Sequence, residues 1–480
     1  MARFLLLSAA ILIAGCASAP QSSAPARAPL EPIAWPDDSR AVELQVLNRV
    51  SWGANSSSAA DIARLGTGRW LDSQLRPARA PLPAEMQARI DAMTISQRPI
   101  ADIAADLERQ RRAFQSAPPE ERKAERQAFQ QELTRLGREA QARMLLRALY
   151  SPNQLEEHMT WFWMNHFSVF QFKGPLRGLL ADYEERAIRP QALGRFRDLL
   201  GATARHPAML IYLDNARNSA GRINENYARE LMELHTLGVE GGYTQRDVEA
   251  LAHILTGWSV DLTSGQLARF YPRRHDFTAK VFLGRTIQGR GAAELDEALD
   301  MLARHPATAH FVSRKLATFF VADEPPAALV ERMAQTFALS DGDIGQVLRT
   351  MFVSPEFRAS LGSKFKDPLH YALSALRLVL DERPLPDAQP VIGALARMGE
   401  PLYARATPDG YPLTRTDWAS PGQLATRFEI ARGIAYRVPV RVWDEPLGPL
   451  SAATRETLAQ ASSPQEWNLL LLSSPEFMNR

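Results

Sequence analysis

Helical periodicity constrains the fold of this 480-residue sequence more than any other feature. In "QELTRLGREAQARMLLRALY", which begins at Gln131, apolar side chains recur every three or four residues. This spacing places them on one face of an α-helix. Alternating strand patterns are scarce, and "KVFLG" at Lys280 is the best candidate for a short extended segment. We therefore expect a mainly α fold: a large, multi-helical single domain with few short strands.

A long segment from Ile103 to Leu149 is highly charged outside its apolar stripe. Pro118 and Pro119 interrupt it in "SAPPEE". Proline breaks a helix interior but is favoured at a first helical position, so one helix ends here and another begins. The pattern predicts a long, mostly solvated, charged helical hairpin. Its apolar stripe is too short for a sustained coiled coil.

Several helix starts carry capping signals. "SPNQ" predicts a capping box, with Ser151 as the cap and Gln154 three residues later. "TQRD" at Thr244 is a weaker version of the same pattern. Asn224 suits an N-cap, and Gly238 suits the end of the helix that would follow it.

The N-terminal residues read as a targeting signal rather than as part of the fold. Arg3 precedes an apolar run that ends at Gly15, shorter than the roughly 17–25 residues of a spanning helix. We expect residues 1–15 to be a signal peptide. The run ends in "IAGC", which resembles the lipobox of bacterial lipoproteins, whose cysteine is acylated and becomes the mature N-terminus. The resemblance implies a lipid anchor on Cys16, and the alternative is an ordinary signal peptide that contains a cysteine.

The residues after the cysteine predict where the protein lies. Ala17, rather than an aspartate, follows Cys16. In lipoproteins this favours the outer membrane, so we expect the periplasmic side of that membrane or the cell surface. Residues 16–38 are rich in Ala, Pro and Ser and predict a lipidated tether, which leaves residues 39–480 for the helical domain.

Composition excludes several function classes. Cys16 is the only cysteine, so its acylation would leave no thiol for a disulfide, a metal site or a nucleophile. A net charge of +2 argues against a general nucleic-acid binder. HExxH, P-loop, nucleophile-elbow and EF-hand motifs do not occur. The sequence identifies neither a cofactor nor a metal.

One helix gathers polar residues in "NENYARELMELHTLGVEGGYTQRDV", residues 224–248. Glu225, Arg229 and Glu233 are spaced at i, i+4 and i+8, which allows a surface salt ladder. In the alternative interpretation, Glu230 or Glu233 faces a polar cavity and acts as a general base. The residues that would support such a site are Asn224, Asn226, Arg229 and His235.

Two further stretches contain candidate site residues. "HMTWFWMNHFSVF" is apolar nearly all round but is interrupted by Asn165 and His166, which need polar partners when buried. "RRHDFTAK" contains His275 and Asp276, which are able to bind a metal or to act as an acid–base pair. Both stretches also fit purely structural roles. We hypothesise that Glu230 shares a pocket with Asn165 and His166.

The stretch "NENYARELMELHTLGVEGGYTQRDVEALAHILTGW" resembles the signature of the bacterial family called domain of unknown function 1800. "NRVSWGA" at Asn48, "WFWMNHF" at Trp161, "HDFTAK" at His275 and "PDGYP" at Pro408 resemble the blocks of that family in the same order. The resemblance extends from about residue 42 to the end of the sequence. It implies one continuous, mostly helical secreted domain but no established activity, cofactor or catalytic residue. Members are often encoded beside a second secreted family, which suggests a secreted protein as a partner.

Two functions remain open from the sequence. The first is an enzyme in the periplasm or at the cell surface with a polar site of Glu, His and Asn side chains. Its candidate catalytic residues are Glu230, Glu233, His166, His275 and Asp276. The second is a non-catalytic helical lipoprotein that binds or assembles with a polymer or a partner protein, which the charged hairpin favours.

Overall fold

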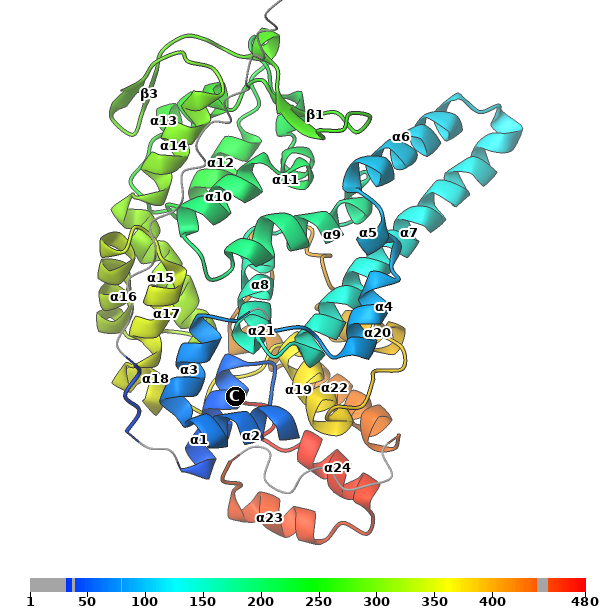
Figure 1. The fold of residues 1–480 in the computed structure, drawn as a ribbon, viewed down its shortest axis with the longest axis vertical. Helices are drawn as coiled ribbons and strands as arrows, with labels where there is room; N and C mark the ends of the chain where they lie inside the picture. Colours follow the sequence, from blue (N-terminus) through cyan, green and yellow to red (C-terminus); the bar gives the residue numbers. More distant parts are fainter. Residues whose placement is uncertain (1–31, 37–38, 79, 438–447) are drawn as a thin grey trace, which may run out of the picture. The chain divides into compact units, whose positions relative to one another are not determined.

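The computed structural model describes residues 32–36, 39–78, 80–437 and 448–480. From Ile33 to Arg480 the chain forms one compact unit, and the structural statements below concern this unit. Its described residues are mainly helical with a few short strands, which confirms the predicted fold class (Figure 1). The predicted signal peptide, Cys16 and most of the predicted tether lie outside the described residues.

The first helices of the unit are short. They are α1 (Arg40–Val50), α2 (Ser56–Leu65), α3 (Thr67–Leu75), α4 (Ala84–Asp91) and α5 (Thr94–Gln97). Asn55 caps α2, because its side chain accepts a hydrogen bond from the Ser58 backbone while the Ser58 side chain bonds back to the Asn55 backbone. Leu44, Leu47 and Trp70 bury the inner faces of α1 and α3 in the main core.

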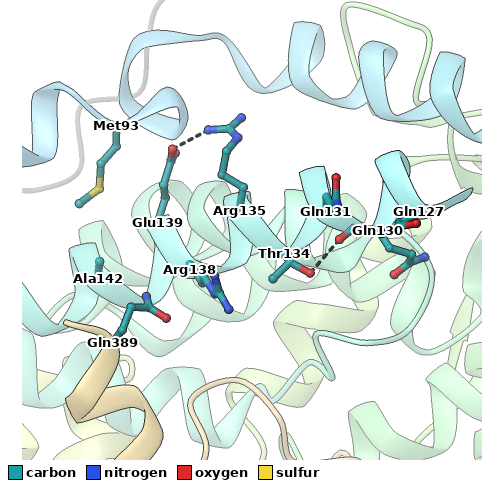
Figure 2. Close-up of a pocket in the computed structure, with 10 residues that line it drawn as sticks. All are labelled: Met93, Gln127, Gln130, Gln131, Thr134, Arg135, Arg138, Glu139, Ala142 and Gln389. Carbon is teal, nitrogen blue, oxygen red and sulfur yellow. Dashed lines mark hydrogen bonds and ion pairs between the residues drawn. The ribbon is translucent and has the colours of Figure 1, made fainter. Parts of the chain in front are cut away.

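The predicted charged hairpin is formed by α6 (Ile100–Ser116) and α7 (Pro119–Tyr150), which lie side by side in Figure 1. The two helices enclose a small apolar core of their own. Its buried residues are Ile103, Leu107, Phe129, Leu133 and Leu136. Figure 2 shows the outer face of α7, where Arg135 donates a hydrogen bond to Glu139 beside a shallow cavity that reaches Met93 and Gln389. The hairpin is therefore apolar inside and charged outside, as its sequence predicts.

The middle of the chain surrounds α8 (Gln154–His166), which is buried on nearly all sides. It is followed by η1 (Leu176–Gly178), α9 (Leu180–Asp182), η2 (Tyr183–Ile188), η3 (Arg189–Gln191), α10 (Phe196–Arg205), α11 (Pro207–Tyr212), η4 (Asn215–Arg217), α12 (Asn226–Glu233) and α13 (Gln245–Ile254). Thr244 and Asp247 form the predicted capping box at α13, where the Asp247 carboxylate accepts the Thr244 N–H at 2.8 Å.

The predicted capping box at Ser151 is wrong. The helix starts later, at Gln154, and Asn153 is its N-cap residue. The Gln154 side chain turns back and donates to the carbonyl oxygens of Ala148 (3.0 Å) and Ser151 (2.8 Å). A capping box would need the side-chain oxygen of Gln154 to accept the Ser151 N–H. That oxygen accepts the Trp52 N–H instead (3.2 Å), and the Ser151 N–H bonds to the carbonyl oxygen of Arg147 in α7.

Two antiparallel hairpins provide the strands of the described chain. β1 (Trp258–Val260) pairs with β2 (Ala268–Phe270), and β3 (Lys280–Phe282) pairs with β4 (Arg285–Ile287), with η5 (Pro272–Arg274) between the hairpins. The extended segment predicted at Lys280 is thus confirmed. Leu283 and Gly284 both have positive φ, as a two-residue type I′ hairpin turn requires.

Helices complete the unit. They are α14 (Ala293–Ala303), α15 (Pro306–Phe320), α16 (Ala327–Leu339), α17 (Ile344–Phe352), α18 (Pro355–Ala359), α19 (Pro368–Leu380), α20 (Gln389–Arg397), α21 (Arg415–Trp418), α22 (Pro421–Ala435), α23 (Ala452–Ala459) and α24 (Pro464–Leu472). Many begin with proline directly after a capping side chain, such as Ser354 before α18 and Asp367 before α19. Within the described ranges, each helix is too short or too polar to span a bilayer.

The two ends of the unit meet in the core. Arg49, on α1, is fully buried and donates through Nε to the carbonyl oxygen of Arg480 at 3.1 Å. Arg480 donates back to the carbonyl oxygen of Arg49 at 3.3 Å. These bonds join segments 431 residues apart.

Candidate functional site

The motif helices α8 and α12 come together at two buried histidines. His166 is the last residue of α8 and is 2% exposed. Its Nε2 lies 3.0 Å from the carbonyl oxygen of His235. A carbonyl only accepts, so Nε2 carries the proton and Nδ1 is left as a bare acceptor. Nδ1 is buried and has no hydrogen-bond partner within the described residues.

His235 lies just beyond the end of α12, in the turn that leads to α13. Its side chain is fully buried, and neither ring nitrogen has a hydrogen-bond partner in the described structure. Burial, and then the positive charge of Lys315, lower the pKa of His235 to about 3. The same causes, together with His235, hold the pKa of His166 well below its usual value. The two rings, 6.0 Å apart, are therefore neutral imidazoles at pH 7.

Lys315 provides an amine beside these rings. It lies on α15, one turn after Phe311 and one turn before Phe319, so a cation occupies an aromatic face of the helix. Its Nζ is 5.6 Å from the centre of the Phe311 ring, and no described residue forms a hydrogen bond or ion pair with it. Burial lowers the pKa of Lys315 to about 8, although Asp409 opposes the shift. About one-tenth of such an amine is unprotonated at pH 7, against about 0.03% for an ordinary lysine.

Two carboxyl groups complete the arrangement, and their environments differ. Burial, then the negative charges of Glu233 and Asp409, raise the pKa of Glu230, which has no hydrogen-bond partner among the described side chains. Burial also acts to raise the pKa of Asp409, but hydrogen bonds from Arg405 (Nη2–Oδ2, 2.8 Å) and Thr407 outweigh it and lower the pKa. Glu230 therefore holds a proton more readily than Asp409. We call Lys315, His166, His235, Glu230 and Asp409 the Lys315 cluster.

The position of Asp409 is set by the loop between α20 and α21. Asn165 of α8 donates through Nδ2 to the carbonyl oxygen of Tyr411 at 2.9 Å, and its Oδ1 accepts the Tyr411 N–H at 2.6 Å. Gly410, between the two, has φ +79°, and a Cβ there would lie 2.2 Å from the carbonyl oxygen of Asn165. Only glycine fits this contact. The "WFWMNHF" and "PDGYP" blocks therefore meet at Asn165.

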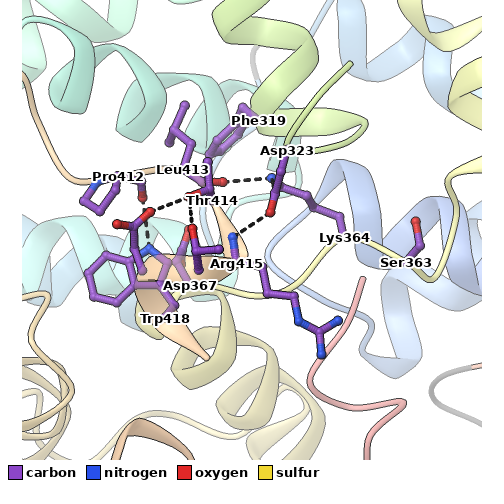
Figure 3. Close-up of polar contacts among 12 residues, drawn as sticks. Phe319, Asp323, Ser363, Lys364, Asp367, Pro412, Leu413, Thr414, Arg415 and Trp418 are labelled. Atoms are coloured by element: carbon purple, nitrogen blue, oxygen red, sulfur yellow. Dashed lines mark hydrogen bonds and ion pairs between the residues drawn. The ribbon is translucent and has the colours of Figure 1, made fainter. Parts of the chain in front are cut away.

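The other end of the loop is held from the turn after α15 and from the segment before α19, as Figure 3 shows. Lys364 forms an ion pair with Asp323 and donates to the carbonyl oxygen of Leu413 at 2.8 Å. Asp323 accepts the backbone N–H of Arg415 at 2.8 Å. The loop that carries Asp409 is thus fixed on both sides.

The remaining polar residues of the α12 stretch lie outside the cluster. Arg229 bridges Glu225 (3.2 Å) and Glu233 (3.4 Å), as the salt-ladder interpretation predicts. Asn224 accepts the N–H of Asn226 at 3.0 Å, so α12 begins two residues after the predicted cap, with Glu225 as its N-cap. Asn226 in turn donates to the carbonyl oxygen of Leu213 at 3.2 Å and ties α12 to the end of α11.

The end of this helix also differs from the prediction. α12 stops at Glu233 rather than continuing to Gly238. Gly238 lies in the following turn with φ +80°, and its N–H bonds to the carbonyl oxygen of Met232. The early stop directs His235 into the core instead of along the helix surface.

His275 and Asp276 do not form a pair with each other. His275 is buried and contacts Glu294 (Nε2–Oε1, 2.9 Å), whose second oxygen accepts from Lys280 at 2.6 Å. Asp276 instead pairs with Nδ1 of His253 at 2.6 Å. The backbone at His275 is extended, so successive side chains point in opposite directions. Both groups lie by the strand hairpins, apart from the contacts of the Lys315 cluster.

Within the described chain, no group of three or more His, Cys, Asp or Glu side chains is placed to hold a metal ion. The Lys315 cluster is thus a set of amine, imidazole and carboxyl groups without a metal-ligand geometry.

Sequence reasoning missed Lys315 and gave Asp409 no role of its own. A signal existed for each. Lys315 is four residues from both Phe311 and Phe319, a cation on an otherwise aromatic helical face. Asp409 stands inside the quoted "PDGYP" block, two residues before the tyrosine that Asn165 holds.

The fold and the cluster define a mainly α-helical protein with a small polar site set in an apolar helical core. The chain belongs to the family of proteins of unknown function DUF1800, whose model matches residues 45–479. The resemblance seen in the sequence is confirmed. No curated protein and no solved structure matches the chain.

Proposed function

We propose that the protein is an envelope lipoprotein whose helical unit is an enzyme that performs acid–base chemistry at the Lys315 cluster. The observation that carries this proposal is the half-buried, unpartnered Lys315 amine with a pKa of about 8 beside two neutral imidazoles. Strongly shifted groups that converge in one place are typical of active sites. A purely structural lysine would have an acid or a carbonyl oxygen as its partner.

One group of the cluster is suited to accept a proton and another to donate one. Lys315, partly unprotonated at neutral pH, serves as the base. Glu230, whose pKa is raised by burial, serves as the acid rather than as the base that its position in the sequence first indicated. Glu233 is less available, because Arg229 already contacts it. The bare Nδ1 of His166 would accept a hydrogen bond from an N–H or O–H group of the substrate.

The cellular setting is part of the proposal. The lipobox-like sequence supports cleavage before Cys16 and acylation of that residue. The protein would then stand on the periplasmic side of the outer membrane or on the cell surface, with a second secreted protein as its partner. Nucleic acid is not expected as a ligand, because the net charge of the chain is close to zero.

A labelling experiment tests the site without knowledge of the substrate. Acetic anhydride modifies only the neutral amine, so the labelling rate of each lysine, followed by mass spectrometry against pH, reports its pKa. We expect Lys315 to titrate near pH 8, about two units below an ordinary lysine side chain. Titration of Lys315 at the ordinary lysine value of about 10.4 would remove the basis of the proposal.

An activity screen then separates enzyme from binding protein. Wild type, Lys315→Met and Lys123→Met would be assayed against chromogenic esters, amides and glycosides. Turnover that is lost only in Lys315→Met supports catalysis at the cluster. Turnover that survives this substitution places the chemistry elsewhere.

A binding role is the second candidate, and the α6–α7 hairpin favours it. The hairpin has its own small apolar core, and its outer face carries ion pairs such as Arg135–Glu132. Such a hairpin offers an extended contact surface for a partner rather than a pocket for a small ligand. The test is a pull-down of the secreted protein that is encoded beside this one. Its capture by wild type, but not by a variant in which α6 and α7 are each shortened by two turns, would support a binding role. Equal capture by both chains would exclude it.

A further inference from the structure

An apolar cavity of 440 Å³ lies between α19, α20 and α22, and it shares no residue with the Lys315 cluster. Its walls include Leu376, Val379, Val391, Ala394, Ile430 and Ile434. The volume falls within the range of about 300–1,000 Å³ that is usual for small-molecule sites. The lining is aliphatic, so the matching part of a ligand is a hydrocarbon chain rather than a polar group.

One wall of the cavity is rigid. It is formed by the loop between α19 and α20 and by the first turn of α20, which place Pro384, Pro386 and Pro390 against the space. Arg89 donates to the carbonyl oxygen of Leu385 at 2.6 Å, and Tyr150 donates to that of Arg383 at 2.8 Å. Proline fixes the backbone, and these bonds attach the loop to α4 and α7. A preformed wall lowers the entropy cost of binding.

Arginines stand around the cavity. Arg397 and Arg437 are exposed and form no hydrogen bond or ion pair with described residues. Arg383 also lines the cavity and donates to the carbonyl oxygens of Leu380 and Val379 at the end of α19. These three guanidinium groups give the rim its positive charge.

The acidic groups of the rim are already engaged. Asp387 accepts the N–H of Gln389 at 3.0 Å, at the start of α20. Glu429 forms an ion pair with Arg432 at 2.5 Å. Three arginines and two carboxylates line the cavity, so its lining carries one net positive charge, and Arg397 and Arg437 form no ion pair with described residues. Both guanidinium groups are thus suited to an anion.

We propose that this cavity binds one monomeric anionic amphiphile, with its hydrocarbon chain between α19, α20 and α22 and its carboxylate or phosphate head group on Arg397 and Arg437. An aliphatic interior with a cationic rim matches this class of ligand in both parts. The proposal is independent of the chemistry at Lys315.

Dodecanoate is the probe, measured by isothermal titration calorimetry with the full chain below its micelle concentration. Dodecyltrimethylammonium has the same chain and the opposite charge. We expect the anion to bind at least tenfold more tightly than the cation. Equal affinities, or no binding of dodecanoate, would overturn the proposal.

Two glycines of α22 provide a matched pair of variants. Gly433 lines the cavity and Gly422 does not, and a Cβ at either position meets no atom within 4 Å. Gly433→Trp should fill the mouth of the cavity and weaken dodecanoate binding at least tenfold. Gly422→Trp should leave binding unchanged, and both variants should unfold at similar temperatures. Equal binding by the two variants would contradict the assignment of the cavity.

A second pair of variants tests the charge. Arg397→Gln removes a rim charge, whereas Arg246→Gln removes an exposed arginine on α13. We expect only Arg397→Gln to weaken dodecanoate binding, severalfold, and we expect it not to weaken the binding of the cationic amphiphile. Equal weakening by the two substitutions would show that the net charge of the protein, and not a contact with Arg397, affects dodecanoate binding.

Other occupants give distinct results. If anionic phospholipid vesicles bind wild type and Gly433→Trp equally while dodecanoate does not bind, the face contacts a membrane surface instead. If the full chain does not bind dodecanoate and a peptide of residues 438–447 binds the cavity, the occupant is the chain itself. Either outcome overturns the proposal.

Discussion

Asn165 and Tyr411, 246 residues apart, form two hydrogen bonds with each other, one in each direction. Through them the buried helix α8 fixes the loop that carries Asp409. The side chain that interrupts an apolar helix therefore has a positioning role, while its neighbour His166 faces the cluster.

Asn165→Ala should lower the free energy of unfolding by about 1–3 kcal/mol, because a partly buried N–H and carbonyl of Tyr411 lose their partners. Urea unfolding measures this loss. Asn153→Ala is the control, because the Asn153 side chain makes an exposed bond to the carbonyl of Ala78, and its loss should cost less than about 1 kcal/mol. Equal losses of unfolding free energy in the two variants would show that the bonds to Tyr411 stabilise the protein no more than an exposed bond does.

Gly410→Ala should be more destabilising than Gly221→Ala. Both glycines have φ near +80°, so both substitutions carry the same backbone strain. Only at Gly410 would the new Cβ meet another atom, the carbonyl oxygen of Asn165, whereas the space around Gly221 is open. We expect a difference of more than about 1 kcal/mol in urea unfolding. A similar cost at both positions would mean that the loop can move away from α8.

Asp409→Asn should lower the pKa of Lys315 below about 8. The Asp409 charge stabilises the ammonium form and opposes the effect of burial, so its removal leaves burial unopposed. Acetic anhydride labelling against pH measures the change, with Asp323→Asn as the control for loss of an acid that contacts this loop from the turn after α15. An unchanged or higher pKa would place Asp409 too far away to act on the amine.

Buried His235 should make the protein less stable in acid. Its pKa is lowered to about 3 in the fold, so its contribution is fully present above the unfolded value of about 6.5 and is lost as the pH falls toward 3. One proton corresponds to a slope of about 1.4 kcal/mol per pH unit. His235→Phe should flatten the decline in unfolding free energy between pH 6 and 4 by about this slope. His310→Phe, at an exposed position, should leave the slope unchanged, and equal slopes in all three proteins would contradict the prediction.

Glu230→Gln should stabilise the protein slightly at pH 7, by up to about 1 kcal/mol. The raised pKa of Glu230 means that its ionised form opposes folding: stability is lost as the pH rises from about 4.5 through the folded pKa. The amide removes repulsion from Glu233 and Asp409. Glu225→Gln should have the opposite sign, because Glu225 pairs with Arg229. Thermal unfolding gives both signs, and destabilisation by Glu230→Gln would indicate an ion pair instead.

Local patterns were sufficient for much of the fold. The stripe of α7, the capping box at Thr244 and the extended segment at Lys280 each depend on neighbours within a few residues. The Ser151 box failed because the side-chain oxygen of Gln154 accepts from Trp52, 102 residues away, and the Ser151 N–H bonds to the preceding helix. Sequence patterns specify elements well where the competing interactions are also local.

The cluster was only partly predictable, because its geometry depends on tertiary packing. His166, His235 and Glu230 stand out in the sequence as polar groups among apolar ones. The sequence neighbour of Asp276 is not its partner. Asp276 pairs with His253 of α13, whereas His275 pairs with Glu294 of α14. Lys315 acts on His235 from α15. The apolar periodicity of a sequence predicts that such a helix forms but not which other segments it packs against.

The bonds between Asn165 and Tyr411 also set an order of events during biosynthesis. A ribosome adds about 5–20 residues per second, so α8 waits roughly 12–50 s for Tyr411 to be made. Until then Asp409 does not exist, and the two imidazoles and the amine have no fixed loop beside them. Chains that stall or are truncated before Asp409 therefore lack one member of the Lys315 cluster and the bonds that hold its loop, so any chemistry that needs the whole cluster requires a nearly complete chain.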